Sequence, residues 1–359
     1  MRRALLTLVC GATLWLPGSA SADVRLTQFG GTFDHAVDVT APPGDAHRVF
    51  VVEESGQVFI FRDGQQLATP FLDVSDRDLY RVGLTSIAFA PDYAETGHVY
   101  ALYDIHAPTA DNSEGIRVEL DEFTVKPDDR DQVDPASRRN LLDLDYTDGT
   151  DHDADYIEFG PDGLLYMTVG EGLVTPELAQ DTSSPRGKVL RIDPHPNGDS
   201  AYTVPPDNPY SEGGGLPEVF AYGVRNPWRF GFDANGHMVI GDVQEGGPEE
   251  LNLLDIAGGG GTNFGWPCFE GTNPKNPCDP EPTNTVAPIL SYTHTGNRCA
   301  VIAGREVRDP SLPTLVGRFT WGDFCTGELR SLLPTSPAAT DDQPIGAVTV
   351  HAPFFTLSS

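Results

Sequence analysis

One repeated unit constrains the fold of this chain more than any other feature of its sequence. Residues 87–104, 157–171 and 230–242 share one plan: an apolar segment ending in Phe, a turn containing Asp or Asn, and a second apolar segment ending near an acid. Residues 37–54 are a looser fourth copy, and successive copies start about 50 to 75 residues apart. This period predicts propeller blades with long insertions, because a β-sandwich would not explain the repeat.

The rest of the sequence also favours an all-β fold. Short β-type segments recur along the chain, bounded by Gly, Pro, Asp and Asn. Residues 47–61 predict a hairpin that turns at Ser55 and Gly56. Amphipathic helical patterns are scarce, and residues 248–256 are among the few that predict even one helical turn.

The N-terminus has the pattern of a secretory leader. Two arginines follow Met1, an apolar stretch comes next, and small residues precede a predicted cleavage after Ala22. We predict a signal peptide over residues 1–22 and a single β-propeller domain over residues 23–359, with export to the periplasm or the exterior. No later apolar run reaches about 18 residues, so no membrane span is predicted.

The C-terminal part of the chain raises the question of how a propeller would close. A propeller commonly completes its last blade with strands from both ends of the chain. No further copy of the repeated unit precedes Ser359. We therefore expect either a domain that lacks its last strands at the C-terminus or a propeller that closes in an unusual way.

The cysteines indicate disulfides. After the predicted cleavage four remain, all in the last third of the chain: Cys268, Cys278, Cys299 and Cys325. An even number in an oxidising compartment favours two disulfides over a metal site. Chain order suggests the pairs Cys268–Cys278 and Cys299–Cys325, although three pairings are possible.

The chain is strongly acidic, and this excludes some partners. Its 23 basic and 53 acidic residues give a formal net charge of −30. Such a surface repels nucleic acid and anionic membranes. It is suited to solubility in salt or to binding divalent cations.

Several longer motifs, taken together, resemble one family. Residues 219–243 read VFAYGVRNPWRFGFDANGHMVIGDV and are followed by EELNLL and GGGGTNFGWP. With residues 83–93, 151–172 and 187–210 in the same order, they resemble the soluble quinoprotein sugar dehydrogenases of the glucose/sorbosone and aldose type, which are six-bladed β-propellers. Residues 317–332 are similar to the cysteine-bearing branch, which includes hedgehog-interacting-protein-like members. The resemblance covers roughly residues 25–335.

The resemblance implies a reaction and a set of site residues. The family oxidises the anomeric hydroxyl of a sugar to a lactone with pyrroloquinoline quinone (PQQ) as acceptor. The matching base is His152, with Asp151 as the acid that fixes its tautomer, and an imidazole suits this task because its pKa lies near neutrality. Arg225 and Asn226 match the pair that reaches the cofactor.

The resemblance also implies a calcium ion. In the family its ligands include main-chain carbonyls that map here to Gln244 and Glu245. Calcium favours oxygen ligands of this kind. We therefore expect two cofactors, PQQ and Ca²⁺.

This chain departs from the family pattern at several positions. Asp153 and Asp155 follow the proposed base, and they add negative charge where a tricarboxylate cofactor would bind. Arg81 and Glu171 also differ from the usual residues.

Two kinds of cofactor-binding cation also lack a match in this sequence. A lysine that contacts the quinone in glucose-oxidising members would fall near Cys325, where there is none. A C-terminal arginine pair is also missing, and Arg308, together with Arg305, is the candidate replacement.

These features lead to one main functional prediction and two alternatives. The main one is a PQQ- and Ca²⁺-dependent dehydrogenase acting on an aldose-type sugar and passing electrons to an unidentified acceptor. The first alternative is a non-catalytic secreted propeller that binds a protein or glycan. The second is a hydrolytic propeller, such as a lactonase, which would need no quinone.

Overall fold

Five antiparallel sheets, called blades 1 to 5 in chain order, make up the fold of the described residues. Blade 1 contains β1 (Ala36–Thr40), β2 (Arg48–Glu53), β3 (Gln57–Arg62), β4 (Gln65–Gln66) and β5 (Leu72–Asp73). Blade 2 contains β6 (Leu79–Phe89), β7 (His98–His106), β8 (Ile116–Lys126) and β9 (Asp129–Tyr146). Blade 3 contains β10 (Ala154–Phe159), β11 (Leu165–Val169), β12 (Lys188–Ile192), β13 (Val219–Tyr222) and β17 (Thr262–Asn263), which is parallel to β13.

The two remaining blades and the short elements complete the described structure. Blade 4 contains β14 (Arg229–Phe232), β15 (His237–Asp242), β16 (Glu249–Asp255) and β20 (Leu290–Tyr292). Blade 5 contains β21 (Val301–Glu306), β22 (Phe319–Asp323), β23 (Leu329–Leu332) and β24 (Gln343–Pro344). Outside the blades lie the hairpin β18 (Phe269–Glu270) and β19 (Asn273–Pro274) and the short helices α1 (Tyr93–Thr96), η1 (Pro176–Ala179) and η2 (Thr295–Asn297).

The computed structural model describes residues 24, 29–107, 115–146, 151–334 and 339–345. The predicted signal peptide lies outside the described residues, as does the C-terminal end of the chain. The described part shows five blades, so the prediction of six stays a prediction. None of the helices in this part has the length and apolar character needed to cross a bilayer.

Each copy of the repeated unit forms the first two strands of a blade, as predicted. The three full copies become β6–β7, β10–β11 and β14–β15, and the looser copy becomes β1–β2. The predicted hairpin at Ser55 and Gly56 is confirmed as β2–β3, with Gly56 at φ 95°, a conformation that glycine adopts without a steric penalty. The helical turn predicted for residues 248–256 was wrong. This segment is β16, because tertiary pairing with β15 outweighs its weak helical pattern.

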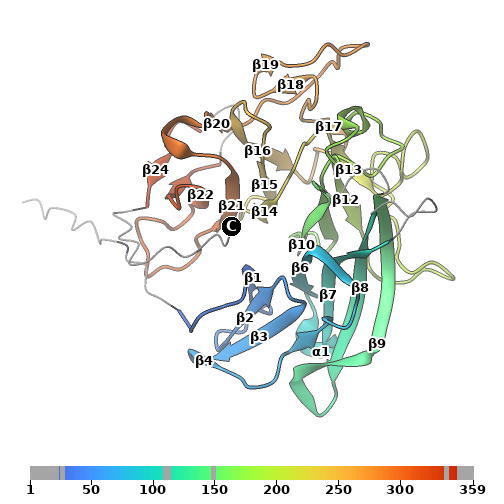
Figure 1. Ribbon diagram of the computed structural model, residues 1–359, viewed down its shortest axis with the longest axis vertical. Helices are drawn as coiled ribbons and strands as arrows, with labels where there is room; N and C mark the ends of the chain where they lie inside the picture. The colour runs from blue at the N-terminus through green and yellow to red at the C-terminus, as the bar shows by residue number, and fades with distance from the viewer. Residues whose placement is uncertain (1–23, 25–28, 108–114, 147–150, 335–338, 346–359) are drawn as a thin grey trace, which may run out of the picture.

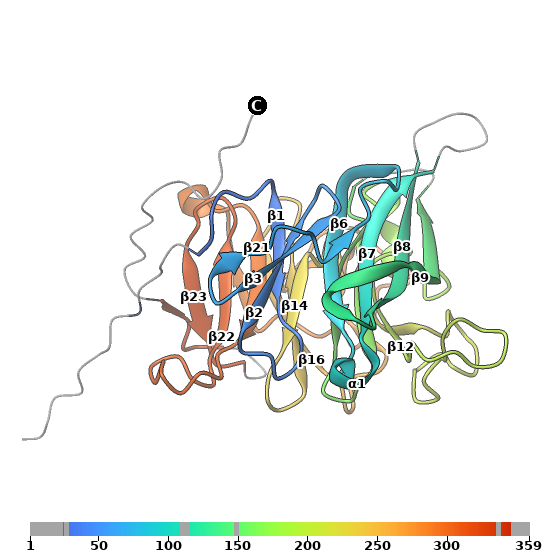
Figure 2. The same ribbon diagram turned by 90° about the horizontal axis from the view of Figure 1, so that it is seen from below.

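The core of the molecule lies between blades. Four apolar clusters fill the interfaces between blades 1 and 2, 2 and 3, 3 and 4, and 4 and 5. Figure 1 looks down the axis around which the blades are arranged, with β1, β6, β10, β14 and β21 nearest to it. Figure 2 shows the blades from the side, with their strands running between two faces of the molecule. Such packing of sheet on sheet is what a propeller requires.

A buried arginine ties the inner strands together at the axis. The guanidinium of Arg229 on β14 donates to the carbonyls of Val37 on β1 at 2.9 Å, Thr85 on β6 at 3.2 Å and Asp155 on β10 at 3.1 Å. A cation with several fixed donors can satisfy carbonyls from several strands at once. We assign Arg229 a structural role.

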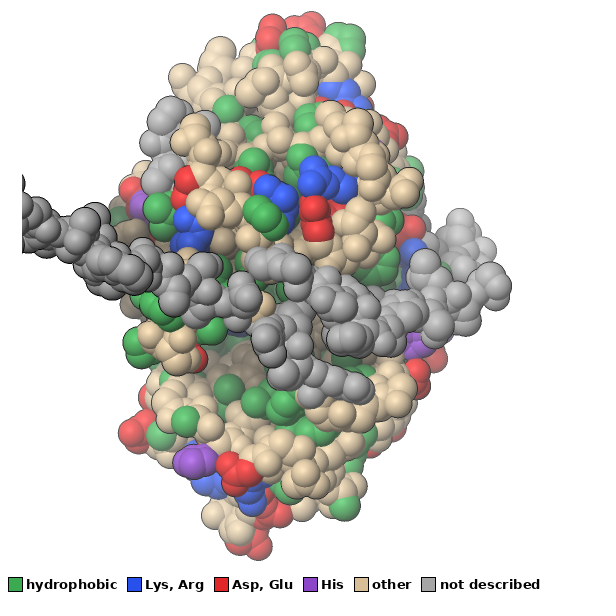
Figure 3. Space-filling model, turned by 90° about the vertical axis from the view of Figure 1, so that its left-hand side faces the viewer, with side chains coloured by type: hydrophobic (Ala, Val, Ile, Leu, Met, Phe, Trp, Pro, Cys, Tyr) green, Lys and Arg blue, Asp and Glu red, His purple; other side chains and the backbone are tan. Residues whose placement is uncertain are grey.

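Blades 1 and 5 lie on the same side of the molecule, the side that faces the viewer in Figure 3. Apolar side chains are visible on the lower half of this view. A cavity of about 410 Å³ is lined by residues of β1, β14 and β21 at the axis.

Both predicted disulfides are confirmed. Cys268–Cys278 closes the loop that carries β18 and β19, and Cys299–Cys325 joins the start of β21 to the residues after β22. The first bridge holds a hairpin that projects from blade 4, seen at the top of Figure 1.

Candidate active site

The segments that precede the inner strands meet on one face of the propeller, which we call the amino face. Three contacts join them. Arg81 pairs with Asp151 between blades 2 and 3. The N–H of Glu171 donates to the carbonyl of Arg225 between blades 3 and 4. The N–H of Val301 donates to the carboxylate of Glu249 between blades 4 and 5. Every candidate residue just before an inner strand therefore lies on this face.

An acid at the end of the second strand recurs on this face and binds the start of its own blade. In blade 1, Glu53 accepts the N–H of Asp34 at 3.0 Å. In blade 4, Asp242 accepts the N–H of Arg225 and, at 2.7 Å, that of Asn226. A carboxylate that accepts backbone N–H groups fixes the direction in which the inner strand begins.

Blade 5 follows the same rule. Asp323 accepts the N–H of Cys299 at 3.0 Å and that of Ala300 at 3.3 Å. The recurring acid of the sequence repeat thus has a structural function that the sequence alone did not reveal.

Blade 3 uses this acid differently. Glu171, two residues beyond β11, places Oε1 3.0 Å from Nδ1 of His152. Both side chains are largely buried, and His152 has φ 54°, a left-handed conformation that is uncommon for residues other than glycine. A strained backbone and an acid-held imidazole together are typical of a functional residue.

From the sequence we expected Asp151 to hold the imidazole of His152, but the structure places a different acid there. Asp151 forms an ion pair with Arg81, and the acid on Nδ1 of His152 is Glu171. The reason is directional, because His152 turns its ring toward the end of β11 while Asp151 faces blade 2. Glu171, one of the departures from the family pattern, is therefore the partner of His152.

Asp153 and Asp155 carry less negative charge than their residue type suggests. Both are buried between blades 2 and 3 with Asp104 nearby. Burial raises the pKa of Asp153 to about 7, helped by the charge of Asp151, and it raises the pKa of Asp155 well above the usual range. Near neutral pH these carboxyls oppose an anionic cofactor less than the sequence implied.

Arg225 and Asn226 lie at the start of blade 4, next to the His152–Glu171 pair of blade 3. The Nη1 of Arg225 donates to the carbonyl of Val243 at 2.8 Å, and its guanidinium lies 5.4 Å from the centre of the Trp266 ring. Four buried polar atoms in this region have no hydrogen-bond partner: Arg225 Nε, Asn226 Oδ1, Gln244 Oε1 and Trp266 Nε1.

These four unpaired atoms indicate where a ligand could bind. Buried polar groups in folded proteins are nearly always hydrogen-bonded, so a cluster of unpaired donors and acceptors indicates a place for a polar ligand. The two donors, Arg225 Nε and Trp266 Nε1, fit carboxylate or carbonyl oxygens such as those of PQQ, and the two amide oxygens fit a ligand N–H or a cation.

The predicted calcium ligands lie beside this cluster. Gln244 is buried, and the N–H of Glu245 donates to Glu270 at 3.1 Å. Within the described ranges, no group of three or more His, Cys, Asp or Glu side chains is placed to hold a metal. The expected ligands are main-chain carbonyls, so calcium stays a prediction.

Arg308 is not near the other predicted cofactor residues. It follows the end of β21, 65% of its side chain is exposed, and its Nε contacts Glu306 at 3.0 Å. The six residues of β21 separate it from the amino face, a length of about 20 Å. Arg305 is on the same strand and pairs with Glu158 and Tyr156. The structure therefore does not bring Arg308 together with the other predicted cofactor residues, because β21 carries it to the opposite face.

A basic side chain that the sequence reasoning missed does reach the site. Lys275, on the disulfide-closed hairpin, places Nζ 2.8 Å from Glu245 and 3.1 Å from Glu270, and 4.8 Å from the centre of the Trp266 ring. No sequence signal distinguished it, because its position depends on how the hairpin folds back.

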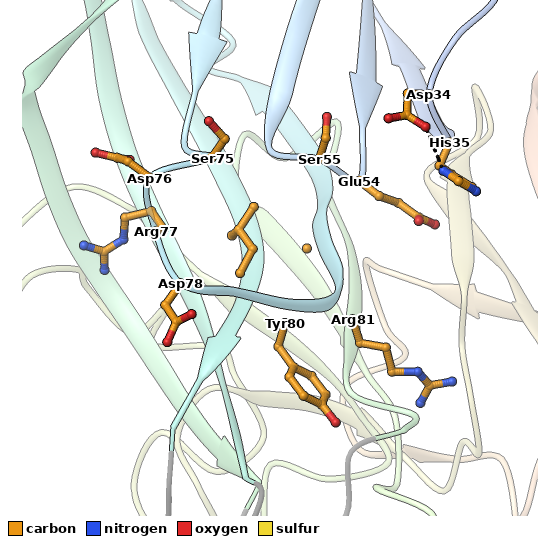
Figure 4. A pocket seen from close by; sticks show the side chains of 12 residues that line it. Asp34, His35, Glu54, Ser55, Ser75, Asp76, Arg77, Asp78, Tyr80 and Arg81 are labelled. Carbon is orange, nitrogen blue, oxygen red and sulfur yellow. Dashed lines mark hydrogen bonds and ion pairs between the residues drawn. The ribbon is translucent and has the colours of Figure 1, made fainter.

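A polar cavity lies between blades 1 and 2. It has a volume of about 660 Å³ and is lined by residues that include Glu54, Asp78, Tyr80 and Arg81 (Figure 4). Arg81 also pairs with Asp151, the residue before His152. The walls of the cavity hold hydroxyls, carboxylates and the rings of His35 and Tyr80, a mixture that suits a polyhydroxylated ligand.

The fold and site define a β-propeller with a histidine–carboxylate pair and an unfilled set of polar atoms on one face. The family described as Glucose / Sorbosone dehydrogenase matches residues 33–312, and the chain belongs to this family.

Sequence relatives come from both branches of the family. The chain is 27% identical over 351 residues to the HIPL1 protein of Arabidopsis thaliana, a match that covers 79% of this chain and 50% of the relative. It is 30% identical over 201 residues to the Hedgehog-interacting protein of Mus musculus, covering 52% of this chain and 29% of the relative. It is 25% identical over 272 residues to the aldose sugar dehydrogenase YliI of Escherichia coli, covering 73% and 66%. The chain thus spans about half the length of the plant relative.

A solved structure shows the same fold. The PQQ-bound form of the aldose sugar dehydrogenase from Streptomyces coelicolor superposes with a TM-score of 0.68 at 20% identity, covering 89% of this chain and 84% of that one. At this level of identity the likeness supports the propeller fold alone.

Proposed function

We propose that this protein oxidises an aldose-type sugar at its anomeric carbon to the lactone, with PQQ as the acceptor and Ca²⁺ as a second cofactor. The observation that carries the proposal is the His152–Glu171 pair lying beside the orphaned polar atoms of the Arg225 cluster. A base and a polar ligand site on one face are what this reaction needs. Family membership supports the same chemistry.

His152 is the proposed general base. Its Nδ1–H donates to Glu171, which leaves Nε2 free of a proton to accept the one on the anomeric hydroxyl. The Glu171 carboxylate then stabilises the imidazolium that forms. When bound, PQQ supplies the oxidising power and accepts the hydride from C1.

Arg225, Asn226 and Gln244 are the proposed cofactor-binding residues. The guanidinium of Arg225 offers an unpaired Nε–H to a ligand oxygen, whereas the side-chain oxygens of Asn226 and Gln244 accept, for example from a ligand N–H. A fixed donor such as Arg225, aimed at a place where negative charge develops, lowers the barrier without reorganisation. The main-chain carbonyls of Gln244 and Glu245 are the proposed calcium ligands.

The sugar is proposed to occupy the cavity between blades 1 and 2. The carboxylates of Glu54 and Asp78 can accept hydrogen bonds from the hydroxyl groups of the sugar, and the ring of Tyr80 offers an apolar wall. Two disulfides and a leader-like start of the chain support a secreted or periplasmic protein.

A reconstitution experiment tests the proposal. The full-length protein is mixed with PQQ and Ca²⁺, then supplied with a panel of aldoses and an artificial electron acceptor. We expect sugar-dependent reduction of the acceptor and a change in quinone absorbance. If the loaded protein reduces no acceptor with any sugar and the quinone spectrum does not change, the proposal is wrong.

One observation favours a second candidate, a secreted propeller that binds a protein or glycan. The chain is similar to the Hedgehog-interacting protein, and a disulfide-closed hairpin projects from blade 4 beside the site. In that case a His152→Ala protein would bind its partner as the unchanged protein does. Hydrolysis of a lactone without quinone would instead indicate the third alternative, a lactonase.

A further inference from the structure

A hairpin closed by a disulfide holds Lys275 beside the candidate active site. The disulfide Cys268–Cys278 closes the loop that carries it, and Trp266 lies under the loop with 4% exposure. Only 20% of the lysine side chain is exposed, so its charge sits in a partly dehydrated position. Interactions of a charge in such a position are stronger than on an open surface.

The lysine and Arg225 both lie against the ring of Trp266. Lys275 places Nζ 4.8 Å from the centre of that ring and 2.8 Å from a carboxylate oxygen of Glu245, and the guanidinium of Arg225 lies 5.4 Å from the same ring centre. The two cations come from the hairpin and from the start of blade 4, so only the folded chain brings them together.

The side chain of Glu245 is more exposed, and therefore less firmly held, than that of Glu270. Its side chain is 62% exposed, whereas Glu270, the other partner of Lys275, is 10% exposed. An exposed carboxylate on such a pair contributes little to stability and can rotate into solvent. Lys275 would then keep Glu270 as its structural partner and present its charge to a ligand.

We propose that Lys275 and Arg225 form an anion subsite beside Trp266, and that the Glu245 carboxylate occupies it until a ligand carboxylate displaces that side chain. Building on the proposed function, the ligand is one carboxylate of an aromatic polycarboxylate such as PQQ. Lys275 thereby supplies, from the hairpin, a cation that was not identifiable from the sequence. The neighbouring unpaired Arg225 Nε and Trp266 Nε1 provide the remaining donors.

Two substitutions with opposite expected effects test this subsite. Lys275→Gln removes the cation and should weaken PQQ binding about tenfold, the usual size of one charge-assisted contact. Glu245→Gln removes the competing internal anion and should tighten binding severalfold. Lys126→Gln is the matched control, because Lys126 bonds to Gln132 on blade 2, away from the site.

Binding is measured by titrating PQQ into the full chain and following the quenching of tryptophan fluorescence, at two salt concentrations. A pyridine dicarboxylate is titrated in parallel as a simple anion probe. Opposite shifts for the two variants, with a smaller salt dependence for Lys275→Gln, support the subsite. Equal affinities in all four proteins, weaker binding by Glu245→Gln, or no binding of either ligand by the unchanged protein overturns it.

Failure of the subsite and failure of the proposed function are distinguishable. If the two substitutions change PQQ affinity as expected but no sugar is oxidised, the dehydrogenase function is wrong and the subsite is supported. If sugar is oxidised but neither substitution changes PQQ affinity, the subsite is wrong and the dehydrogenase function is supported.

Discussion

Blades 3 and 5 place an acid at the same point of the sheet and use it in different ways. In blade 5, Asp323 ends β22 and binds the backbone N–H groups of Cys299 and Ala300 before the inner strand. In blade 3, Glu171 stands two residues beyond β11 and binds the side chain of His152 instead. Glu171 stands two residues beyond the end of its strand, whereas Asp323 is the last residue of β22, so the two carboxylates start from different positions.

The comparison teaches how a site can arise within a repeated fold. The repeat puts an acid near the start of the inner strand, and in blades 1, 4 and 5 this acid accepts backbone N–H groups. In blade 3 a histidine occupies that start, and the acid already present becomes its partner. The change of partner turns a structural position into a candidate catalytic one.

The largest expected effect concerns the histidine. His152→Ala should lower the turnover number of the PQQ-loaded enzyme about 10²- to 10⁴-fold, because it removes the general base. Steady-state rates with an artificial electron acceptor measure this. The control is His237→Ala, since His237 also pairs with an acid, Asp233 at 2.9 Å, on blade 4 at the other end of β15. Equal losses in both variants would contradict a special role for blade 3.

The next largest effect concerns stability in blade 5. Asp323→Ala leaves the N–H groups of Cys299 and Ala300 and the hydroxyl of Tyr292 without their acceptor. We expect a loss on the order of 3 kcal/mol, seen as a lower thermal midpoint by circular dichroism. Glu171→Gln should change the midpoint much less, because no backbone N–H of the described residues donates to its carboxylate. A larger drop for Glu171→Gln than for Asp323→Ala would break the comparison.

A third effect separates orientation from binding. Glu171→Gln should lower kcat about 10²-fold with little change in KM, because the amide cannot stabilise the imidazolium of His152. Kinetics over a range of sugar concentrations give the two constants separately. Glu177→Gln, an exposed change on η1, is the control. A rise in KM at constant kcat would show that Glu171 binds the sugar rather than orienting the base.

The smallest effect concerns blade 2, whose acid in the matching position is Asp104. It is buried, and burial, aided by the charge of Asp153, raises its pKa to about 8. The folded chain therefore keeps a proton that the unfolded chain loses from about pH 4 upward, so the stability contributed by this group falls as the pH rises toward 8.

Asp104→Asn, which cannot ionise, should raise the thermal midpoint at pH 8.5 relative to the unchanged protein, and change it less at pH 5. Thermal unfolding at the two pH values measures the difference. Asp76→Asn, an exposed change, is expected to show no such dependence. A pH response of Asp104→Asn identical to that of the unchanged protein would contradict the assignment.

Much of the fold followed from local patterns. The strand-turn-strand copies, the hairpin at Ser55 and Gly56 and both disulfides agree with the sequence reasoning, because each depends on residues close in the chain. The error at residues 248–256 arose where pairing with β15 and β20 decided the conformation of a segment with little preference of its own.

The site was only partly predictable for a related reason. His152, Arg225 and Asn226 lie within motifs, so their type and spacing were informative. The partner of His152, the far position of Arg308 and the approach of Lys275 depend on which face each strand reaches and on how the hairpin folds back. No local pattern carries that information.

The sequence by itself determined an all-β chain of repeated strand pairs, its acidic surface, its disulfides and its family. Only the tertiary structure decided that Glu171 rather than Asp151 holds the histidine, that Asp153 and Asp155 are buried, and that Lys275 reaches Glu245. The physical reason is distance. Strand formation and short disulfide loops are governed by neighbours in the chain, whereas the charges of the site come from blades 3 and 4 and from a hairpin, which meet only when the sheets pack around one axis.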